Sequence, residues 1–308
     1  MEEPFHVPVL VKEVAEHLIT THDGVYVDGT VGGGGHAEYI LSKLGKNAKY
    51  IAIDQDLDAL QYAQCRLRKY HNIYFHNTNF SAIDSILKQY HITEIDGLFL
   101  DLGVSSHQVN TTKRGFSYMQ DTVLDMRMNT DMHYNARDLL NQSSEQELSQ
   151  IFYQFSEEKK SRKIARQIVK TRIREPIVTT MQLRAIIDRV VQPKYAIKSY
   201  ARIFQALRIA INRELENLKM VLIHSTKYLN KGGRLVVISY HSLEDRTVKT
   251  FLKEKSNPCK CPPELPECSC GLKPEFKILT KKPVKPAPEE IYNNPRSRSA
   301  LLRVGERL

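Results

Sequence analysis

The first hundred residues alternate between short apolar runs and stretches whose apolar positions recur at helical spacing. The runs at 25–27, 50–53, 72–76 and 97–100 have the length and the β-branched or aromatic content of strands. Between the first two, residues 36–44 place their apolar side chains on one side of a helix. Strands that alternate with helices predict a parallel sheet with helices on both faces.

The pattern changes between about residues 106 and 215. No strand pair is evident there, and helical periodicity marks the stretches 135–140, 145–155, 157–174, 180–191 and 200–215. In the fourth stretch, Leu183, Ile186, Ile187 and Val190 form an apolar stripe at helical spacing. This part of the chain is predicted to be entirely helical.

Strands and helices alternate again after residue 215. A helix over 214–229 meets a stop signal at Lys231-Gly232-Gly233, a β-branched strand follows at 234–239, and another helix covers 244–254. Residues 276–280 and 300–304 can supply the last strands. The predicted architecture is one α/β domain, residues 1–106 and 216–308, interrupted over 107–215 by an all-helical domain that would grip a macromolecular substrate.

Composition narrows the class of protein. The chain has 308 residues and 41% hydrophobic residues, and no apolar run approaches the length of a membrane span. Its first residues lack the basic start and apolar middle of a signal peptide, which predicts a cytoplasmic protein. Five cysteines, an odd number, do not describe a disulfide scaffold.

The net charge of +10 indicates either a polyanionic partner or good solubility. Its distribution is more informative, because one set of basic residues recurs at steps of three or four and would share one helical face. These residues are Lys159, Lys163, Arg166, Lys170 and Arg174. They form either a solvated face or a track for a phosphate backbone.

A glycine loop follows the first predicted strand. Residues 32–35 are all glycine, and only a backbone without side chains turns so tightly. Asp54, at the end of the second strand, lies 20 positions after Gly34. A carboxylate at that spacing accepts the hydroxyls of a bound ribose in a βαβ unit, so the sequence predicts an adenosine-containing cofactor.

Two adenosine cofactors fit such a unit. Gly32, Gly34 and Ala37 satisfy the loose dinucleotide pattern, which is typical of an NAD-linked oxidoreductase. Ligands of such sheets bind beyond the carboxyl ends of the strands, where several residues should converge: Asp28, Gly34, Asp54, Phe80 and Asp101. The loop contains no lysine or arginine to face a pyrophosphate, and this favours S-adenosylmethionine.

Two polar motifs follow later strands. Ser242 and Asp245 resemble a capping box with Asp in place of Glu, while His241 is either a substrate contact or a structural histidine. Near the C-terminus, Arg296 and Arg298 lie in a polar segment, 294–299. This segment is either a solvated tail or a loop folded onto phosphates.

Four cysteines follow a C-x-C-x6-C-x-C spacing in a proline-rich stretch. They are Cys259, Cys261, Cys268 and Cys270. Four thiolates can close a tetrahedral zinc site, although the spacing departs from common C-x2-C pairs. Structural zinc and reduced cysteines are the two alternatives. A catalytic metal is not favoured, because no open-site histidine or carboxylate set accompanies the cysteines.

Nine ordered blocks of the chain resemble the bacterial 16S rRNA (cytosine-N4)-methyltransferases of the MraW/RsmH family. The blocks lie at 6–10, 28–36, 52–54, 101–106, 114–117, 124–128, 204–208, 241–246 and 294–299. The resemblance implies a Rossmann-like class I S-adenosylmethionine-dependent methyltransferase sheet with an inserted helical domain. It also implies a cytidine in the decoding region of 16S rRNA as the target, within the small ribosomal subunit.

The resemblance also assigns residues. It implies that the loop of Gly34, Gly35 and His36 faces the methionine part of the cofactor and that Asp54 binds the ribose. The adenine and the methyl group are assigned to a further set: Phe80, Asp101 and Gln108. Many amino-methyltransferases carry an Asp/Asn/Ser-Pro-Pro-aromatic motif after the fourth strand, whereas here Leu102-Gly103 follows Asp101, as in the family.

The mechanism expected from these residues is direct displacement by the exocyclic amine of an extruded cytosine, with Asp101 as the acceptor that stabilises the amine. A purely cofactor-binding Asp101 is the alternative. RNA contacts are predicted for a set of polar residues: His241, Arg296, Arg298, Lys163, Arg166 and Lys170. A non-catalytic RNA-binding assembly factor is a rival function, and a homodimer is one alternative to a monomer.

Overall fold

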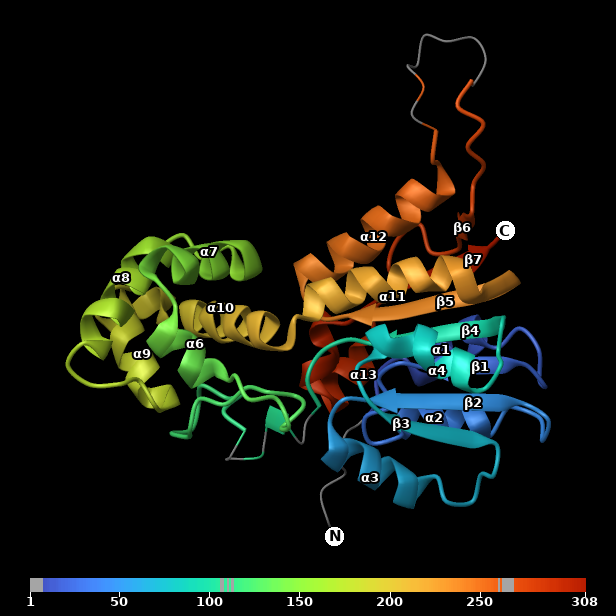
Figure 1. Ribbon diagram of the computed structural model, residues 1–308, viewed down its shortest axis with the longest axis horizontal. Coiled ribbons are helices and arrows are strands. Elements are labelled where there is room, and N and C mark those ends of the chain that lie inside the picture. The colour runs from blue at the N-terminus through green and yellow to red at the C-terminus, as the bar shows by residue number, and fades with distance from the viewer. Residues whose placement is uncertain (1–7, 106–107, 110, 112–113, 260, 262–268) are drawn as a thin grey trace. The chain divides into compact units, whose positions relative to one another are not determined.

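The computed structural model describes residues 8–105, 108, 109, 111, 114–259, 261 and 269–308. The chain divides into two compact units (Figure 1). The sheet unit consists of Met1–Gly103 and Leu215–Leu308, and the helical unit of Val104–Glu214. Within the described ranges, no helix is both long and apolar enough to cross a membrane.

One seven-stranded sheet forms the centre of the sheet unit, in the order β3-β2-β1-β4-β5-β7-β6. Strands β1 to β5 are parallel, and β7 is antiparallel to both β5 and β6. The bounds are β1 Val25–Asp28, β2 Lys49–Asp54, β3 Ile73–Asn77, β4 Ile95–Asp101, β5 Leu229–Ser239, β6 Phe276–Ile278 and β7 Leu301–Arg307. The strand order reverses between β1 and β4, which is where open sheets of this kind bind ligands.

Helices cover both faces of the sheet. Tyr26 and Phe99 pack in one core with α1, α2 and α3, whereas their strand neighbours Val27 and Leu98 pack in another with α4, α11 and α12. Alternate strand residues thus enter opposite cores, which confirms the predicted α/β sheet. The helices are α1 Val11–Leu18, α2 Gly35–Leu41, α3 Leu57–Arg66, η1 Phe80–Ala82, α4 Ile83–Gln89, α11 Glu214–Tyr228, α12 Ser242–Ser256, α13 Pro288–Asn293 and η2 Pro295–Ser299.

Helices α6 to α10 build the helical unit around its own apolar core. Their bounds are α6 Ala136–Gln142, α7 Glu145–Ser156, α8 Ser161–Arg172, α9 Thr180–Asp188 and α10 Pro193–Asn212. Phe152, Leu183 and Ile203 are fully buried in this core. The predicted stripe on the fourth helical stretch therefore packs inward, as its spacing indicated.

Two helix starts in the helical unit differ from the prediction by four residues or more. Glu157 adopts a left-handed conformation (φ 53°) that ends α7, so α8 begins only at Ser161 and Lys159 lies outside it. The acidic side chain of Glu158 is buried and accepts hydrogen bonds from the backbone N–H of Lys160 and the hydroxyl of Ser199. α10 begins at Pro193 rather than near residue 200, because proline suits the first helical turn.

Candidate active site

Three carboxylates lie at the ends of neighbouring strands in the sheet unit. Asp28, Asp54 and Asp101 are the last residues of β1, β2 and β4. Because these strands are parallel and adjacent, their carboxyl ends share one edge of the sheet. We call these three residues the acidic edge.

The glycine loop lies between β1 and α2, beside the acidic edge. Gly32 (φ 51°) and Gly34 (φ 76°) both adopt left-handed conformations, and Gly34 caps α2. A Cβ atom on Gly34 would lie 3.1 Å from Leu67 Cδ1, so this position combines strain with close packing. The glycine-only turn expected here is therefore present in the structure.

Asp54 holds the glycine loop in place. Its Oδ2 accepts a hydrogen bond from the backbone N–H of Gly32 (2.8 Å), and its Oδ1 accepts one from the backbone N–H of Asp56 (2.9 Å). Burial raises the pKa of Asp54 to about 6, although these hydrogen bonds lower it. Each carboxylate oxygen has two lone pairs, so Asp54 has the capacity to accept further hydrogen bonds, and its predicted contact with ribose hydroxyls stays a prediction.

His36 is a buried anchor of the loop. Its Nε2 lies 2.7 Å from the carbonyl oxygen of Val9, and burial lowers its pKa to about 4. The neutral ring must donate from Nε2 to this carbonyl, which leaves Nδ1 without a proton. The 3.6 Å contact between Nδ1 and Asp101 Oδ2 is consequently not an ion pair at neutral pH.

Asp101 is fixed on two sides. Its backbone N–H donates to Thr30 Oγ1 (2.6 Å), and its Oδ1 accepts a hydrogen bond from the hydroxyl of Tyr240 (3.0 Å). Burial raises the pKa of Tyr240 well above its usual value, so the hydroxyl keeps its proton. Sequence reasoning missed Tyr240, although it directly precedes the His241 motif at the end of β5.

Asp28 is the most deeply buried member of the acidic edge. Its Oδ1 accepts from the backbone N–H of Thr30 and its Oδ2 from the hydroxyl of Tyr50, each at 3.0 Å. Burial raises the pKa of Asp28 to about 7. With no exposed surface, Asp28 serves as a brace beneath the loop rather than as a ligand at the strand tips.

Phe80 and Gln108 occupy different units. Phe80 is half-buried and is the first residue of η1. A Cβ atom added to Gly29 would lie 2.9 Å from the Cβ atom of Phe80. Gln108 is buried in the helical unit, where its Oε1 accepts a hydrogen bond from the backbone N–H of Ser105 (3.0 Å). Their predicted cofactor contacts stay predictions.

The predicted capping box of Ser242 and Asp245 is wrong. His241 is the N-cap of α12, where Nδ1 accepts from the backbone N–H of Glu244 (3.4 Å), and Glu244 Oε2 accepts from the backbone N–H of Tyr240 (2.9 Å). The carboxylate of Asp245 instead forms a bidentate pair with Arg303, with distances of 2.6 and 3.0 Å. Glutamate reaches back to the cap more readily than aspartate.

The arginines and lysines predicted to contact RNA lie on exposed surfaces of the two units, whereas the side chain of His241 is only 10% exposed. Arg296 and Arg298 lie in η2, exposed on either side of the buried Ser297. Lys163, Arg166 and Lys170 are exposed on α8 in the helical unit, opposite the buried Ile164 and Ile168. Arg166 Nε lies 3.2 Å from Glu145 Oε1, which partly offsets its charge.

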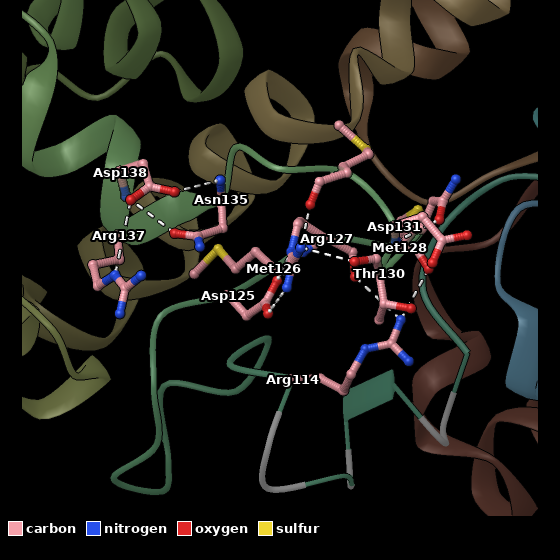
Figure 2. Close-up of polar contacts among 12 residues, drawn as sticks. Arg114, Asp125, Met126, Arg127, Met128, Thr130, Asp131, Asn135, Arg137 and Asp138 are labelled. Carbon is pink, nitrogen blue, oxygen red and sulfur yellow. Dashed lines mark hydrogen bonds and ion pairs between the residues drawn. The ribbon is translucent and has the colours of Figure 1, made fainter.

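A polar network organises the helical unit between residues 114 and 138 (Figure 2). The guanidinium of Arg127 contacts both carboxylate oxygens of Asp125 at 2.7 Å and donates to the carbonyls of Thr130 and Met132. Arg114 Nη2 donates to the carbonyls of Arg127 (3.1 Å) and Met128 (3.0 Å). Met126, within the same segment, has a left-handed backbone (φ 62°), which costs energy and persists only where surrounding contacts hold it. The motif residues of 114–117 and 124–128 supply such contacts through Arg114, Asp125 and Arg127.

Three of the four motif cysteines lie close together. The Sγ atoms of Cys259, Cys261 and Cys270 are all within 4.8 Å of one another. Tetrahedral zinc with Zn–S bonds of about 2.3 Å needs sulfur atoms roughly 3.8 Å apart, so modest adjustment would suit the ion. Cys268, the fourth predicted ligand, lies outside the described residues.

Comparisons with known proteins match this chain over nearly its whole length. A model of the MraW methylase family matches residues 3–308. "Ribosomal RNA small subunit methyltransferase H" of Clostridium botulinum (strain Loch Maree / Type A3) is 48% identical over 301 residues, covering 97% of each chain. The protein of the same name from Caldicellulosiruptor saccharolyticus is 47% identical over 304 residues, covering 98% of this chain and 99% of that one.

Solved structures match more distantly. A putative rRNA-methylase from Clostridium thermocellum aligns with a TM-score of 0.45 and 11% sequence identity, covering 97% of this chain and 95% of that one. A similarity this distant supports no argument about function.

Proposed function

The chain belongs to the MraW methylase family, and we propose that it transfers a methyl group from S-adenosylmethionine to N4 of a cytidine in 16S rRNA. The relatives' name, rRNA small subunit methyltransferase, supplies the substrate class. The observation that carries the proposal is the acidic edge beside the glycine loop in a chain that matches the family from residue 3 to 308. Family membership decides against the oxidoreductase and the non-catalytic assembly factor.

The cofactor is proposed to lie along the acidic edge. S-adenosylmethionine supplies an electrophilic methyl group on its sulfonium when it is bound. Asp54 would accept the ribose hydroxyls while it holds Gly32, and Gly34 to His36 would border the methionine part. Phe80 and Gln108 would border the adenine. The glycine loop has no lysine or arginine to bind a pyrophosphate, which suits S-adenosylmethionine because this cofactor has none.

Asp101 is proposed to act on the cytosine amine. The lone pair of this amine is delocalised into the ring, so alignment and stabilisation of developing positive charge should dominate catalysis. Asp101 meets this need because Thr30 and Tyr240 fix its position and its side chain is only 11% exposed. Low exposure strengthens its electrostatic effect on the amine.

RNA binding is proposed for exposed cations of both units. Lys163, Arg166 and Lys170 on α8, together with Arg296 and Arg298, would bind phosphates, and His241 would border the substrate. The target cytidine would lie in the decoding region of the small subunit and leave its stack before reaction. We accordingly propose that the reaction takes place in the cytoplasm.

Structural zinc is proposed for the cysteine cluster. Thiolates of Cys259, Cys261 and Cys270 would hold it, with Cys268 as the fourth ligand. Elemental analysis of the purified chain should find one zinc per molecule, and Cys259→Ser should lose it. Zinc-free wild-type protein that folds normally would contradict this part.

The proposed activity is tested by calorimetry and methyl transfer together. S-adenosylmethionine should bind and NADH should not, and labelled methyl groups should enter 16S rRNA. Asp54→Asn should weaken cofactor binding, since an amide offers one acceptor oxygen fewer to the ribose and to Gly32. Binding of NADH, or no methyl transfer to RNA despite cofactor binding, would contradict the proposal.

A further inference from the structure

A groove of about 420 Å³ lies in the sheet unit, past the carboxyl end of β5. β7 runs antiparallel to β5 and pairs Leu301 with Ser239, so the start of β7 meets the end of β5 at this edge. The first turns of α12 form the opposite wall, with Arg246 and Lys249 among the lining residues. The volume is in the range of ligand sites.

The charges around the groove favour an anion. Asp245 lines it, but the bidentate pair with the buried guanidinium of Arg303 offsets its negative charge. Glu244 is 2% exposed and turns its carboxylate into the α12 cap. Arg246 and Lys249 are both exposed, and they are the cations that line the groove.

Tyr240 connects the groove with Asp101. Tyr240 lines the groove, and its hydroxyl donates to Asp101 Oδ1 at 3.0 Å. A Cβ atom on Gly103 would lie 3.0 Å from the same ring, so the glycine permits this close packing. A single side chain, that of Tyr240, therefore links the groove to Asp101, the residue proposed to act on the amine.

We propose that this groove binds a phosphodiester of the RNA next to the target nucleotide, with Lys249 as the main charged contact and Ser299 as a neutral donor. The inference rests on the proposed function and adds a site to it. Phosphate contacts fix the register and orientation of a nucleic acid. The groove lies on the β5 side of β4, whereas Gly34, Asp54 and Phe80 follow strands on the β1 side, so both ligands can bind together.

The test is a charge reversal with a matched control. In the full-length chain, Lys249→Glu should raise the Kd for a 16S rRNA transcript about tenfold or more, because a charge-assisted hydrogen bond is lost. The slope of log Kd against log salt should fall by about one. Lys249→Arg keeps the charge and should bind nearly as the wild type does.

Lys253→Glu is the control, since Lys253 is exposed one turn further along α12 and does not line the groove. It should change the Kd for RNA by no more than about twofold, because an exposed charge without a direct hydrogen bond to the phosphate contributes only a weak, solvent-screened attraction. Cofactor affinity should be the same in all variants. Equal effects of Lys249→Glu and Lys253→Glu, in a protein whose wild type methylates RNA, would overturn the groove site. A wild type that fails to methylate RNA would instead contradict the proposed function.

Discussion

Asp101 is the residue on which the proposed chemistry depends most. Thr30 and Tyr240 hold it at the end of β4, so its carboxylate does not need to reorganise during the reaction. Asp101→Asn keeps the shape but removes the charge. We expect the rate at saturating cofactor to fall roughly 10² to 10³-fold, as is usual when one stabilising group is lost, while cofactor affinity changes little. Single-turnover kinetics measures the rate.

Tyr240→Phe is the companion variant, because it removes only the hydroxyl that positions Asp101. It should lower the rate less than Asp101→Asn. If Asp101→Asn weakens cofactor binding and rate together, with normal turnover once the cofactor saturates, Asp101 is a binding residue and its acceptor role is wrong.

Asp28 predicts a pH dependence of stability. Burial raises its pKa from 3.8 to about 7, so the folded chain keeps a proton that the unfolded chain releases above pH 3.8. The contribution of Asp28 to the free energy of unfolding therefore falls as the pH rises from 3.8 toward 7. Asp28→Asn removes the titrating group. The free energy of unfolding of the variant minus that of the wild type should therefore rise by roughly 2 kcal/mol between pH 5 and pH 7. Urea unfolding at both pH values measures the difference.

His36 acts in the opposite direction in the same pH range. Its pKa is lowered from 6.5 to about 4, so the unfolded chain takes up a proton first and stability is lost as the pH falls below 6.5. This contribution is common to wild type and Asp28→Asn and cancels in their difference. A difference that stays constant from pH 5 to pH 7 would show that Asp28 is ionised normally in the folded protein.

At the level of elements, the stability of the glycine loop should be more sensitive to substitution of Gly34 than of Gly32. Gly34→Ala places a side chain at φ 76° and 3.1 Å from Leu67, whereas Gly32→Ala at φ 51° meets nothing closer than 3.9 Å. We expect Gly34→Ala to lower the free energy of unfolding by about 1–2 kcal/mol from backbone strain, with a further loss from the contact. Denaturant unfolding should show a smaller loss for Gly32→Ala, and equal losses would contradict the close packing.

α8 should contribute to RNA binding through charge. Lys163→Ala with Lys170→Ala removes two exposed cations from one face, which should weaken RNA binding and lower the salt slope by about two. Lys194→Ala with Lys198→Ala is the control on α10, with the same charge loss. Fluorescence anisotropy across a salt series compares them. Indistinguishable slopes for the two pairs would exclude a specific role for α8.

Elements with a strong local signal were predictable from the sequence. β1, β2 and β4 lie within two residues of their predicted bounds at each end, because their apolar runs end abruptly in polar or glycine residues. The start of α8 was not predictable, since the basic spacing already includes Lys159, and only the structure shows the left-handed turn at Glu157.

The site was predictable where chain order determines position. Asp54 and Asp101 share an edge because parallel strands align their carboxyl ends. Tyr240 was not predictable as a partner of Asp101, because 139 positions separate them and the contact depends on the pairing of β4 with β5. The α12 cap was assigned to Ser242 because serine is a common N-cap, but His241 occupies that place.

The whole molecule combines a sheet unit that carries the acidic edge with a helical unit that carries the basic face of α8. A net charge of +10 suits a polyanionic substrate, and each unit has exposed cations. Most of the predicted cofactor residues belong to the sheet unit. The substrate is proposed to contact both.

Methyl transfer to the ribosomal subunit itself is the decisive experiment for the proposed function. Labelled methyl groups would be supplied on S-adenosylmethionine to small ribosomal subunits that lack the modification, and nuclease mapping with mass spectrometry would identify the modified nucleoside and its position. We predict N4-methylcytidine at one site in the decoding region of 16S rRNA. Label in a different nucleoside, or no label in subunits and free RNA despite cofactor binding, would show that the proposed reaction is wrong.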